Sequence, residues 1–341
     1  MKPISGSAPV IKQINTNLVR QMLKTKGSAT KQEIAWATGL SVVTVNTILR
    51  SLVKQGEVTE SGLTPSLGGR PAMRFAYHSD YALALILYPL EREGRIQVHA
   101  TVVNLSRDPV FETEVDVDQL DLAQLESIMD RLLADYPAIQ AIGLGLPGAE
   151  HEGKMIVSDY QSLLGVSLST HLYSRYKRPI IIENDVNAAV IGFSTRQHVA
   201  LEQTVVYFYF PQRHPPGAGI FMNGRLHKGK GNFAGEVAHI PLGIPWGDST
   251  LSATFDTWCC AIAKLTVAVS SVLNPDLVVL CGYGIKQEHV KAVVDRCSTQ
   301  LPPSVMPHLH HSEDFAADYL SGMIVQTLDT LETGPILQQK R

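Results

Sequence analysis

Residues 30–56 read TKQEIAWATGLSVVTVNTILRSLVKQG and contain two helical patterns separated by a short break. Thr30 and Glu33 have the spacing of a capping box, in which each side chain satisfies a backbone amide of the other residue at a helix start. Gly39 is a helix stop, and Ser41 is a good N-cap for a second, longer amphipathic helix. The stretch therefore predicts helix, tight turn, helix.

The segments on either side of this stretch complete a small domain. Residues 12–25 place apolar side chains at helical spacing and precede a Lys-Gly stop, which predicts a first helix. Residues 59–75 are rich in glycine and proline and predict a two-stranded wing, whose tip is the run GGRP at residues 68–71. We therefore predict a winged helix-turn-helix domain of the α+β class over residues 1–78.

Charged residues are distributed unevenly along the chain. Residues 1–80 contain 10 lysines and arginines against 4 aspartates and glutamates, a net charge of +6, whereas the remaining residues carry −9. A basic module beside an acidic one is typical of a DNA-binding domain joined to a ligand-binding domain, because phosphate neutralisation concentrates cations on one of them. The alternative is that the three helices and the hairpin serve only for protein contacts.

The predicted DNA contacts follow from the geometry of a helix-turn-helix, whose second helix lies in the major groove with its N-terminal residues facing base edges. Asn46 is the residue best suited to read a base, because its side-chain amide can pair bidentately with adenine. Arg70 on the wing is placed to enter a narrow minor groove. Base contacts are predicted for Ser41, Val42, Val43, Thr44, Asn46 and Thr47, and phosphate contacts for Lys31, Gln32, Arg50 and Lys54. We expect a dimer that reads two half-sites of double-stranded DNA.

From residue 81 onward, strand patterns alternate with helical patterns. Such alternation predicts an α/β body, in which helices cover a mixed sheet and ligands bind where loops leave the strand ends. The predicted strands are 82–88, 95–104, 110–117, 138–146, 179–183, 204–210, 217–222 and 277–281, and the predicted helices are 120–136, 167–176, 186–196 and 254–273.

The composition excludes several other classes of protein. With 45% apolar and 18% charged residues, the 341-residue chain is neither disordered nor fibrous. The longest apolar run, around residues 82–90, is broken by Pro89 and is too short for a membrane span, and the first residues lack a stretch of signal-peptide length. The four cysteines show no C-x-x-C spacing, so we expect them to be reduced and mostly buried. A cytoplasmic protein with no membrane contact is the expectation.

Three further motifs follow the predicted wing in a fixed order. They are GLGLPG at residues 143–148, IENDVNAA at 182–189 and AGEVAH at 234–239. Together with the GGRP run they resemble the ROK family of bacterial sugar-responsive repressors and sugar kinases, over nearly the whole chain. The resemblance implies an actin-like, sugar-kinase type (ribonuclease H-like) body of two α/β lobes, with the sugar held between them. We expect the lobes at residues 79–190 and 191–341, with a C-terminal helix that returns to the first lobe.

The resemblance also implies an effector site. Asp185 occupies the position of the catalytic base of ROK kinases, and Asn184 would hydrogen-bond a neighbouring sugar hydroxyl. Glu236 and His239 match the Gly-Glu-x-x-His motif that lines the sugar in the family. A carboxylate beside an amide can bind adjacent hydroxyls as acceptor and donor. The alternative is a structural turn in which Asp185 only caps the helix that begins at Val186.

Departures from the family pattern argue against phosphoryl transfer. Kinases of this fold hold phosphates with glycine-rich loops, since only glycine lets backbone amides approach closely. The first strand, residues 83–89, contains no Asp and no Gly, and residues 210–216 contain three prolines, which lack the amides that would cradle phosphate. Only the Gly-x-Gly turn at residues 282–284 partly survives. We therefore predict a non-catalytic sensor with no cofactor.

A second departure concerns the zinc site of the family, which pairs the His of Gly-Glu-x-x-His with a Cys-x-Cys-Gly cluster. His239 matches, but residues 240–258 contain no cysteine, and Cys259 and Cys260 are adjacent, without ligand spacing. We predict that no metal is bound.

The preferred hypothesis is a DNA-binding transcriptional repressor, dimeric or tetrameric, whose body binds a sugar or a sugar derivative. One alternative is an active ROK sugar kinase with an appended DNA-binding head. The other is a regulator that answers to a protein partner.

Overall fold

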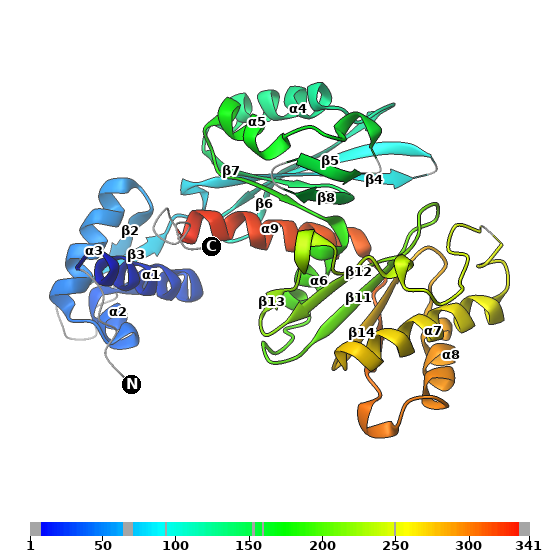
Figure 1. Cartoon of the computed structure of the whole chain (residues 1–341). Helices are drawn as coiled ribbons and strands as arrows, with labels where there is room; N and C mark the ends of the chain where they lie inside the picture. Colours follow the sequence, from blue (N-terminus) through cyan, green and yellow to red (C-terminus); the bar gives the residue numbers. More distant parts are fainter. Residues whose placement is uncertain are drawn as a thin grey trace.

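The computed structural model describes residues 8–63, 71–92, 94–151, 154–158, 160–248 and 250–333 (Figure 1). The predicted wing-tip residue Arg70 lies outside these ranges, as do Gly68 and Gly69.

The N-terminal elements form a helical unit with a small antiparallel sheet, which we call the head. In the described part its sheet has the order β1-β3-β2. The elements are α1 (Ala8–Lys26), β1 (Ser28–Thr30), α2 (Lys31–Thr38), α3 (Val42–Gln55), β2 (Val58–Leu63) and β3 (Met73–Tyr77).

Local capping explains where the helices of the head begin and end. The amide of Glu33 donates to Thr30 Oγ1 at 3.3 Å, and the amide of Thr30 donates to Glu33 Oε2 at 2.7 Å, so the predicted capping box is confirmed. Gly39 ends α2 at φ 72°, and Ser41 caps α3 by accepting the Thr44 amide at 3.1 Å. The apolar residues Val45, Ile48, Leu49 and Leu52 of α3 are buried in the head core, as an amphipathic helix requires.

Two mixed sheets form the body that follows the head. The first has the order β10-β7-β4-β5-β6, and the second has the order β13-β12-β11-β14-β15. In each, a parallel set adjoins strands that pair antiparallel. The first sheet contains β4 (Leu83–Arg92), β5 (Arg95–Asn104), β6 (Pro109–Val117), β7 (Ile139–Gly145) and β10 (Ile180–Glu183); the second contains β11 (Val205–Phe210), β12 (Gly217–Met222), β13 (Arg225–Leu226), β14 (Leu277–Gly282) and β15 (His308–His311). A separate ribbon pairs β8 (Gly148–His151) with β9 (Lys154–Ser158).

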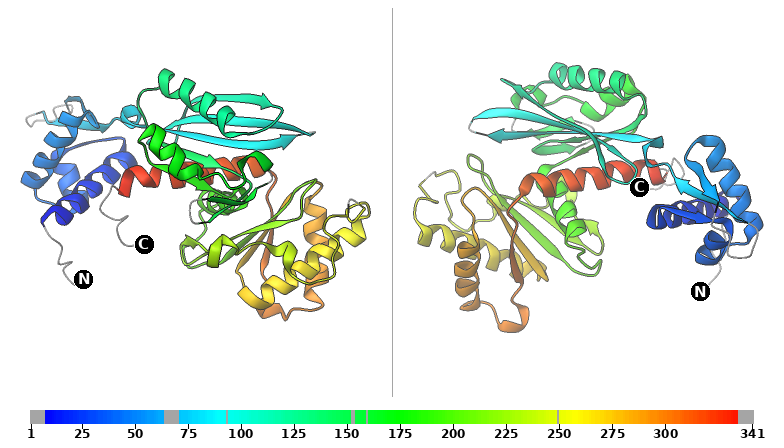
Figure 2. Two further views of the ribbon diagram at one scale, coloured as in Figure 1. Left: turned by 45° about the horizontal axis from the view of Figure 1, so that its top comes forward. Right: turned by 180° about the vertical axis from the view of Figure 1, so that it is seen from behind.

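Helices cover both faces of each sheet. Leu85 and Leu87 of β4 pack with the helices on one face, whereas Ala84 and Ile86 pack with α9 on the other, which explains the apolar run. The helices α4 (Leu122–Asp135) and α5 (Leu168–Tyr176) cover the first sheet, α7 (Phe255–Leu273) and α8 (Gln287–Ser298) cover the second, and α6 (Asp185–Arg196) and α9 (Phe315–Thr333) lie between the sheets (Figures 1 and 2). Short 3₁₀ turns are η1 (Ser79–Tyr81), η2 (Gln161–Leu163), η3 (Lys230–Asn232), η4 (Val237–His239) and η5 (Pro303–Val305).

The contact between α6 and α9 joins the two lobes. A Cβ atom on Gly192 would lie 1.8 Å from the carbonyl oxygen of Asp318, and one on Gly322 would lie 1.8 Å from that of Ala188. Glycine is therefore required at both positions, because the two backbones touch. α6 is continuous across residue 190, so the lobe boundary expected there falls inside a helix. α9 follows the second sheet but packs on β4 and β7 of the first.

By length and composition alone, α7 is long and apolar enough to cross a membrane. Half of its apolar stretch is buried, and α7 contributes Cys259, Ile262 and Leu265 to the core of the second lobe. This packing is that of a core helix in a globular lobe.

Candidate functional site

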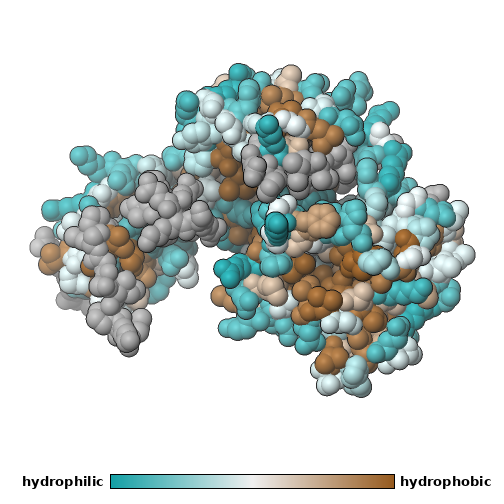
Figure 3. All heavy atoms as spheres, in the orientation of Figure 1, coloured by the Kyte–Doolittle hydropathy of each residue, from teal (hydrophilic) through white to brown (hydrophobic). Residues whose placement is uncertain are grey.

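A cavity of about 790 Å³ opens between the two lobes. On the face shown in Figure 3, the surface is hollowed between them. The cavity is lined where β4, β7 and β10 end, where α6 begins, and by the β11–β12 and β13–α7 connections. Strand ends and a helix start meet here because both sheets direct the carboxyl ends of parallel strands to this edge.

Asn184 caps α6. Its Oδ1 accepts the amides of Val186 at 3.0 Å and Asn187 at 3.1 Å, and its Nδ2 donates to the carbonyl oxygen of Gly148 at 3.1 Å. The helix cap is therefore Asn184, and the alternative in which Asp185 caps the helix is wrong. Asp185 is instead the first residue of α6, half-buried in the cavity wall.

The cavity wall contains a buried carboxylate that the sequence patterns did not single out. Glu183, 4% exposed at the end of β10, accepts the amide of Asn184 at 3.0 Å and Nδ2 of Asn187 at 3.3 Å. Lys228 reaches it from the other lobe, with Nζ 2.7 Å from Glu183 Oε2. The pair joins β10 of the first lobe to the loop after β13 of the second.

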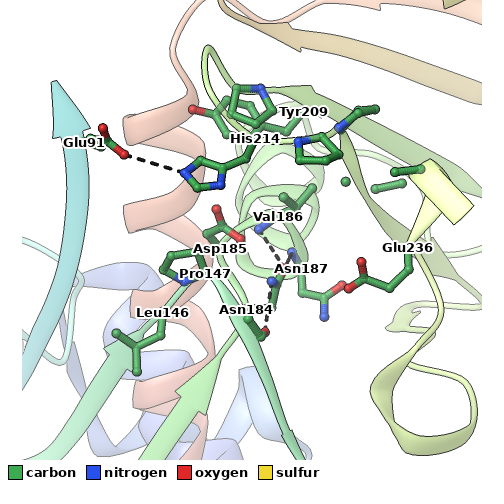
Figure 4. A pocket seen from close by; sticks show the side chains of 18 of the residues that line it. Glu91, Leu146, Pro147, Asn184, Asp185, Val186, Asn187, Tyr209, His214 and Glu236 are labelled. Carbon is green, nitrogen blue, oxygen red and sulfur yellow. Dashed lines mark hydrogen bonds and ion pairs between the residues drawn. The ribbon is translucent and has the colours of Figure 1, made fainter. Parts of the chain in front are cut away.

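A second ion pair crosses the cavity near its mouth. Arg213, in the proline-rich turn between β11 and β12, donates to Glu91 Oε1 at 2.8 Å. His214 Nε2 lies 3.7 Å from Glu91 Oε2 (Figure 4). Residue separations of more than 100 positions hide such a pair from sequence reasoning. We call Arg213–Glu91 and Lys228–Glu183 the cross-cleft pairs.

The remaining predicted effector residues lie on the second lobe. Gly235, at φ +102°, brings the following residue to the cavity, and its carbonyl accepts the Ala218 amide at 2.8 Å. Glu236 lines the cavity, and His239 lines it with its ring 5.5 Å from that of Phe233. The structure thus brings Asn184, Asp185, Glu236 and His239 together around one cavity, with Asp185 and Glu236 on either side of the start of α6 in Figure 4.

Aromatic side chains complete the cavity wall. Tyr209 stacks on Phe315, with ring centroids 3.6 Å apart, and both residues line the cavity. Burial and the neighbouring Asp185 carboxylate raise the pKa of Tyr209 above its ordinary value, so its hydroxyl stays a hydrogen-bond donor. Carboxylates, amides and aromatic faces in one cavity suit a ligand with hydroxyl groups and an apolar ring face.

The segment that would carry the family's zinc ligands is held by aromatic packing. Trp246 and Trp258 lie with ring centroids 6.2 Å apart, and both contact Phe210, at 6.3 and 5.3 Å. Cys259 is buried and Cys260 is exposed. Within the described ranges, no group of three or more His, Cys, Asp or Glu side chains could hold a metal ion.

The predicted DNA contacts on α2, on α3 and at the N-cap of α3 are exposed or half-buried. Val43 is 76% exposed and Val42 47%, while Asn46 is half-buried beside the head core. The Thr47 hydroxyl donates to the carbonyl oxygen of Val43 at 3.0 Å. Trp36 on α2, 86% exposed, was not singled out from sequence. Ser41, Gln32, Thr47 and Arg50 are exposed, and Lys31 and Thr44 are half-buried.

A smaller cavity of about 120 Å³ lies at the joint of head and body. It is lined by Arg20 of α1, by Tyr77 and Tyr81, and by Leu331 near the end of α9. Arg20 pairs there with the buried carboxylate of Glu57, which ties α1 to the start of β2.

Two lobes with matching sheets, a helix pair between them and a polar cavity at their junction define the actin-like, sugar-kinase type fold. Within that class, residues 94–261 match the model of the ROK family, so this part of the chain is a ROK family domain.

Three curated relatives are described as repressors or as a transcriptional regulator. The chain is 25% identical over 248 residues to the xylose repressor of Caldicellulosiruptor bescii, covering 70% of this chain and 61% of the relative. It is 21% identical over 245 residues to the xylose repressor of Bacillus subtilis, covering 68% of this chain and 61% of the relative. It is 24% identical over 252 residues to the dual regulator NagC of Escherichia coli, covering 70% of this chain and 60% of the relative. The matches thus span about 60% of the length of these relatives.

Solved structures with the same fold include a regulator and a kinase. A ROK family transcriptional regulator, described as a homolog of E. coli MLC protein, matches with a TM-score of 0.63 at 19% identity, over 93% of this chain and 96% of that one. The ROK hexokinase from Thermus thermophilus matches with a TM-score of 0.59 at 17% identity, over 74% of this chain and 99% of that one.

Proposed function

We propose that the chain is a DNA-binding transcriptional repressor whose two-lobed body senses a sugar and does not phosphorylate it. The observation that carries the proposal is the joining of a basic three-helix head, with an exposed α3, to a ROK body with a polar cavity. The names of the relatives, xylose repressor and N-acetylglucosamine repressor, support this class of function.

The head, residues 1–78, acts in this proposal as a winged helix-turn-helix. The match to the regulator extends over 93% of the chain, against 74% for the hexokinase, which supports a head of this kind. α3 would enter the major groove with Asn46 and its neighbours facing base edges, while Lys31, Gln32 and Arg50 contact phosphates. Arg70 would act from the wing. A cytoplasmic homodimer would place two heads on two half-sites.

The body would bind its sugar in the cleft between its two lobes. Asp185 and Glu236 accept hydrogen bonds from hydroxyls in this proposal, His239 adds a further polar contact, and Asn184 holds the start of α6 in place. Binding would favour one lobe orientation, and the ligand would act through its different affinities for two states. α9 is suited to transmit the change, since Phe315 lines the cleft and Leu331 lines the joint with the head.

DNA binding is tested by selecting duplexes from a random pool with the full chain, followed by anisotropy measurements. We expect affinity to fall steeply with salt. Asn46→Ala should lose about 1–3 kcal/mol of discrimination at one adenine. Arg50→Ala, as the matched variant, should weaken all sequences alike and reduce the salt slope by about 1. Equal affinity for every duplex, without salt dependence, would overturn the proposal.

A sugar kinase is the second candidate, favoured by Asp185 in the cavity and by the solved kinases of this fold. Phosphoryl transfer depends on positioning and charge stabilisation of the phosphates, and the turn facing Glu91 contains Pro211, Pro215 and Pro216 in place of amide donors. We expect no ATP turnover with a panel of pentoses, hexoses and amino sugars. Turnover that Asp185→Asn abolishes would establish the kinase.

A further inference from the structure

We infer that the cleft selects sugars that carry no phosphate group and rejects the corresponding phosphate esters. The inference rests on the proposed sugar sensing and specifies the charge of the ligand. Phosphate is bound in proteins by unpaired cations, by helix N-termini or by clusters of backbone amides. At this cavity the cations are paired with carboxylates, the helix N-terminus is capped, and the turn contains prolines in place of amide donors.

The cations of the cavity are both engaged by carboxylates. Among the described lining residues, the lysine and arginine side chains are Lys228 and Arg213. Arg213 lies 2.8 Å from Glu91, and Lys228 lies 2.7 Å from Glu183. Glu183 is 4% exposed, so removing Lys228 from it would leave a buried carboxylate without its counter-charge. A phosphate ester would have to break these pairs to gain a cation.

The helix N-terminus at the cavity is also closed to anions. α6 begins here, and the amides of its second and third residues, Val186 and Asn187, donate to Asn184 Oδ1. Asp185 follows at the first helical position, where its negative charge already interacts with the helix dipole. An incoming phosphate would meet this carboxylate at short range.

The turn between β11 and β12 offers few amides. Pro211, Pro215 and Pro216 line the cavity and carry no N–H group. Gly217 follows them at the start of β12, whose backbone pairs with β11.

The charge balance of the lining is negative. Carboxylates contributed by described residues outnumber the two cations; they are Glu91, Asp118, Glu183, Asp185 and Glu236. Carboxylates are acceptors that suit the O–H donors of a neutral sugar, whereas they repel a phosphate dianion inside a partly enclosed cavity. Neutral hydroxyl-rich ligands are therefore favoured over their esters.

The test is calorimetric titration of the full chain with matched pairs: xylose, glucose, N-acetylglucosamine and N-acetylmannosamine, each with its phosphate ester. We expect at least one free sugar to bind, and its ester to bind about 100-fold more weakly or not at all. An ester that binds as tightly as its free sugar, or tighter, overturns the inference but leaves sugar sensing intact. Failure of every free sugar and every ester overturns sugar sensing itself, while the DNA-binding measurement stands apart.

A variant tests the physical cause. Glu91→Gln releases the Arg213 guanidinium while preserving side-chain size. Because Glu91 is exposed, we expect the variant to fold, which a melting curve checks. We expect this variant to bind the phosphate ester about 10-fold more tightly than the wild type does. The matched control is the double variant Glu91→Gln with Arg213→Gln, which should show no gain. An unchanged preference in a folded Glu91→Gln protein would contradict the assigned role of this pair.

Discussion

At the scale of single residues, Asn184 shows how one side chain can serve both the fold and the site. Its side-chain oxygen Oδ1 caps α6, and its side-chain nitrogen Nδ2 donates to the carbonyl oxygen of Gly148 at the end of the GLGLPG run. It thereby fixes Asp185, the next residue, relative to the ribbon that follows β7. The family resemblance places Asn184 against a sugar hydroxyl, whereas the structure gives its polar atoms partners within the protein.

Replacing Asn184 separates these contacts. Asn184→Ala removes the cap and should destabilise the body by about 1 kcal/mol. This should appear as a melting temperature lower by about 2–4 °C in scanning fluorimetry. Asn184→Asp keeps an acceptor for the two amides but loses the donor to Gly148, so it should recover most of the stability. If the alanine and aspartate variants melt alike, capping is not the contribution of Asn184.

At the scale of elements, the start of α2 is held by a hydrogen-bonded carboxylate. The Thr30 backbone amide, the largest cause, lowers the pKa of Glu33 below its ordinary value of 4.5. A folded-state pKa below the unfolded one means that the stabilisation is present above pH 4.5 and is lost as pH falls through the folded value.

The matching prediction compares Glu33→Gln with the wild type from pH 7 to pH 3.5, by urea unfolding of each protein. Glutamine keeps a carbonyl acceptor but not the charge, so the wild type should be more stable at pH 7 and the difference should shrink below pH 4.5. A difference that stays constant with pH would contradict a contribution from the ionised carboxylate.

The crossing of α6 and α9 gives a second prediction for elements. Gly322→Ala would place a Cβ atom 1.8 Å from the carbonyl oxygen of Ala188, so the two helices must separate. We expect a loss of about 2 kcal/mol or more, measured by urea unfolding. Gly247→Ala is the matched control, because nothing lies within 4 Å of a Cβ atom there. Equal stability of both variants would show that the helices do not depend on this contact.

The helices and strands show most clearly which features the sequence predicts and which it does not. Caps such as Thr30 with Glu33 are local, so their spacing alone predicts them. β1 escaped prediction because three residues give no period and its pairing with β3 spans 46 positions. The four effector residues of the ROK motifs do share one cavity, but the cross-cleft pairs depend on how the lobes meet, which no local pattern encodes.

At the scale of the whole molecule, α9 connects the parts that the proposed function needs to couple. It runs between the lobes toward the head (Figure 2), with Phe315 at the cleft and Leu331 at the head–body joint. A change of lobe angle at one end of a rigid helix moves the other end as well. The coupling free energy between two sites in proteins is commonly about 1–3 kcal/mol.

Truncating the Leu331 side chain near the far end of this helix tests the coupling. Leu331→Ala should leave sugar affinity and unliganded DNA affinity close to those of the wild type, while the change in DNA affinity caused by sugar shrinks several-fold. Anisotropy titrations with and without the sugar identified by calorimetry give the comparison. Leu201→Ala, at a site 65% exposed on the second lobe, serves as the control and should retain full coupling. Undiminished coupling in Leu331→Ala would exclude this route.

The prolines between β11 and β12 also bear on how quickly the proposed regulator responds to its ligand. A pocket that turns its ligand into product reports the recent flux of that ligand, and its reset waits on a chemical step. A pocket that only holds the ligand fills and empties with the surrounding concentration, so its occupancy at any moment is set by a dissociation constant. Under the proposed function, gene expression would then follow the abundance of a nutrient in both directions, rising and falling without memory and at no cost in ATP.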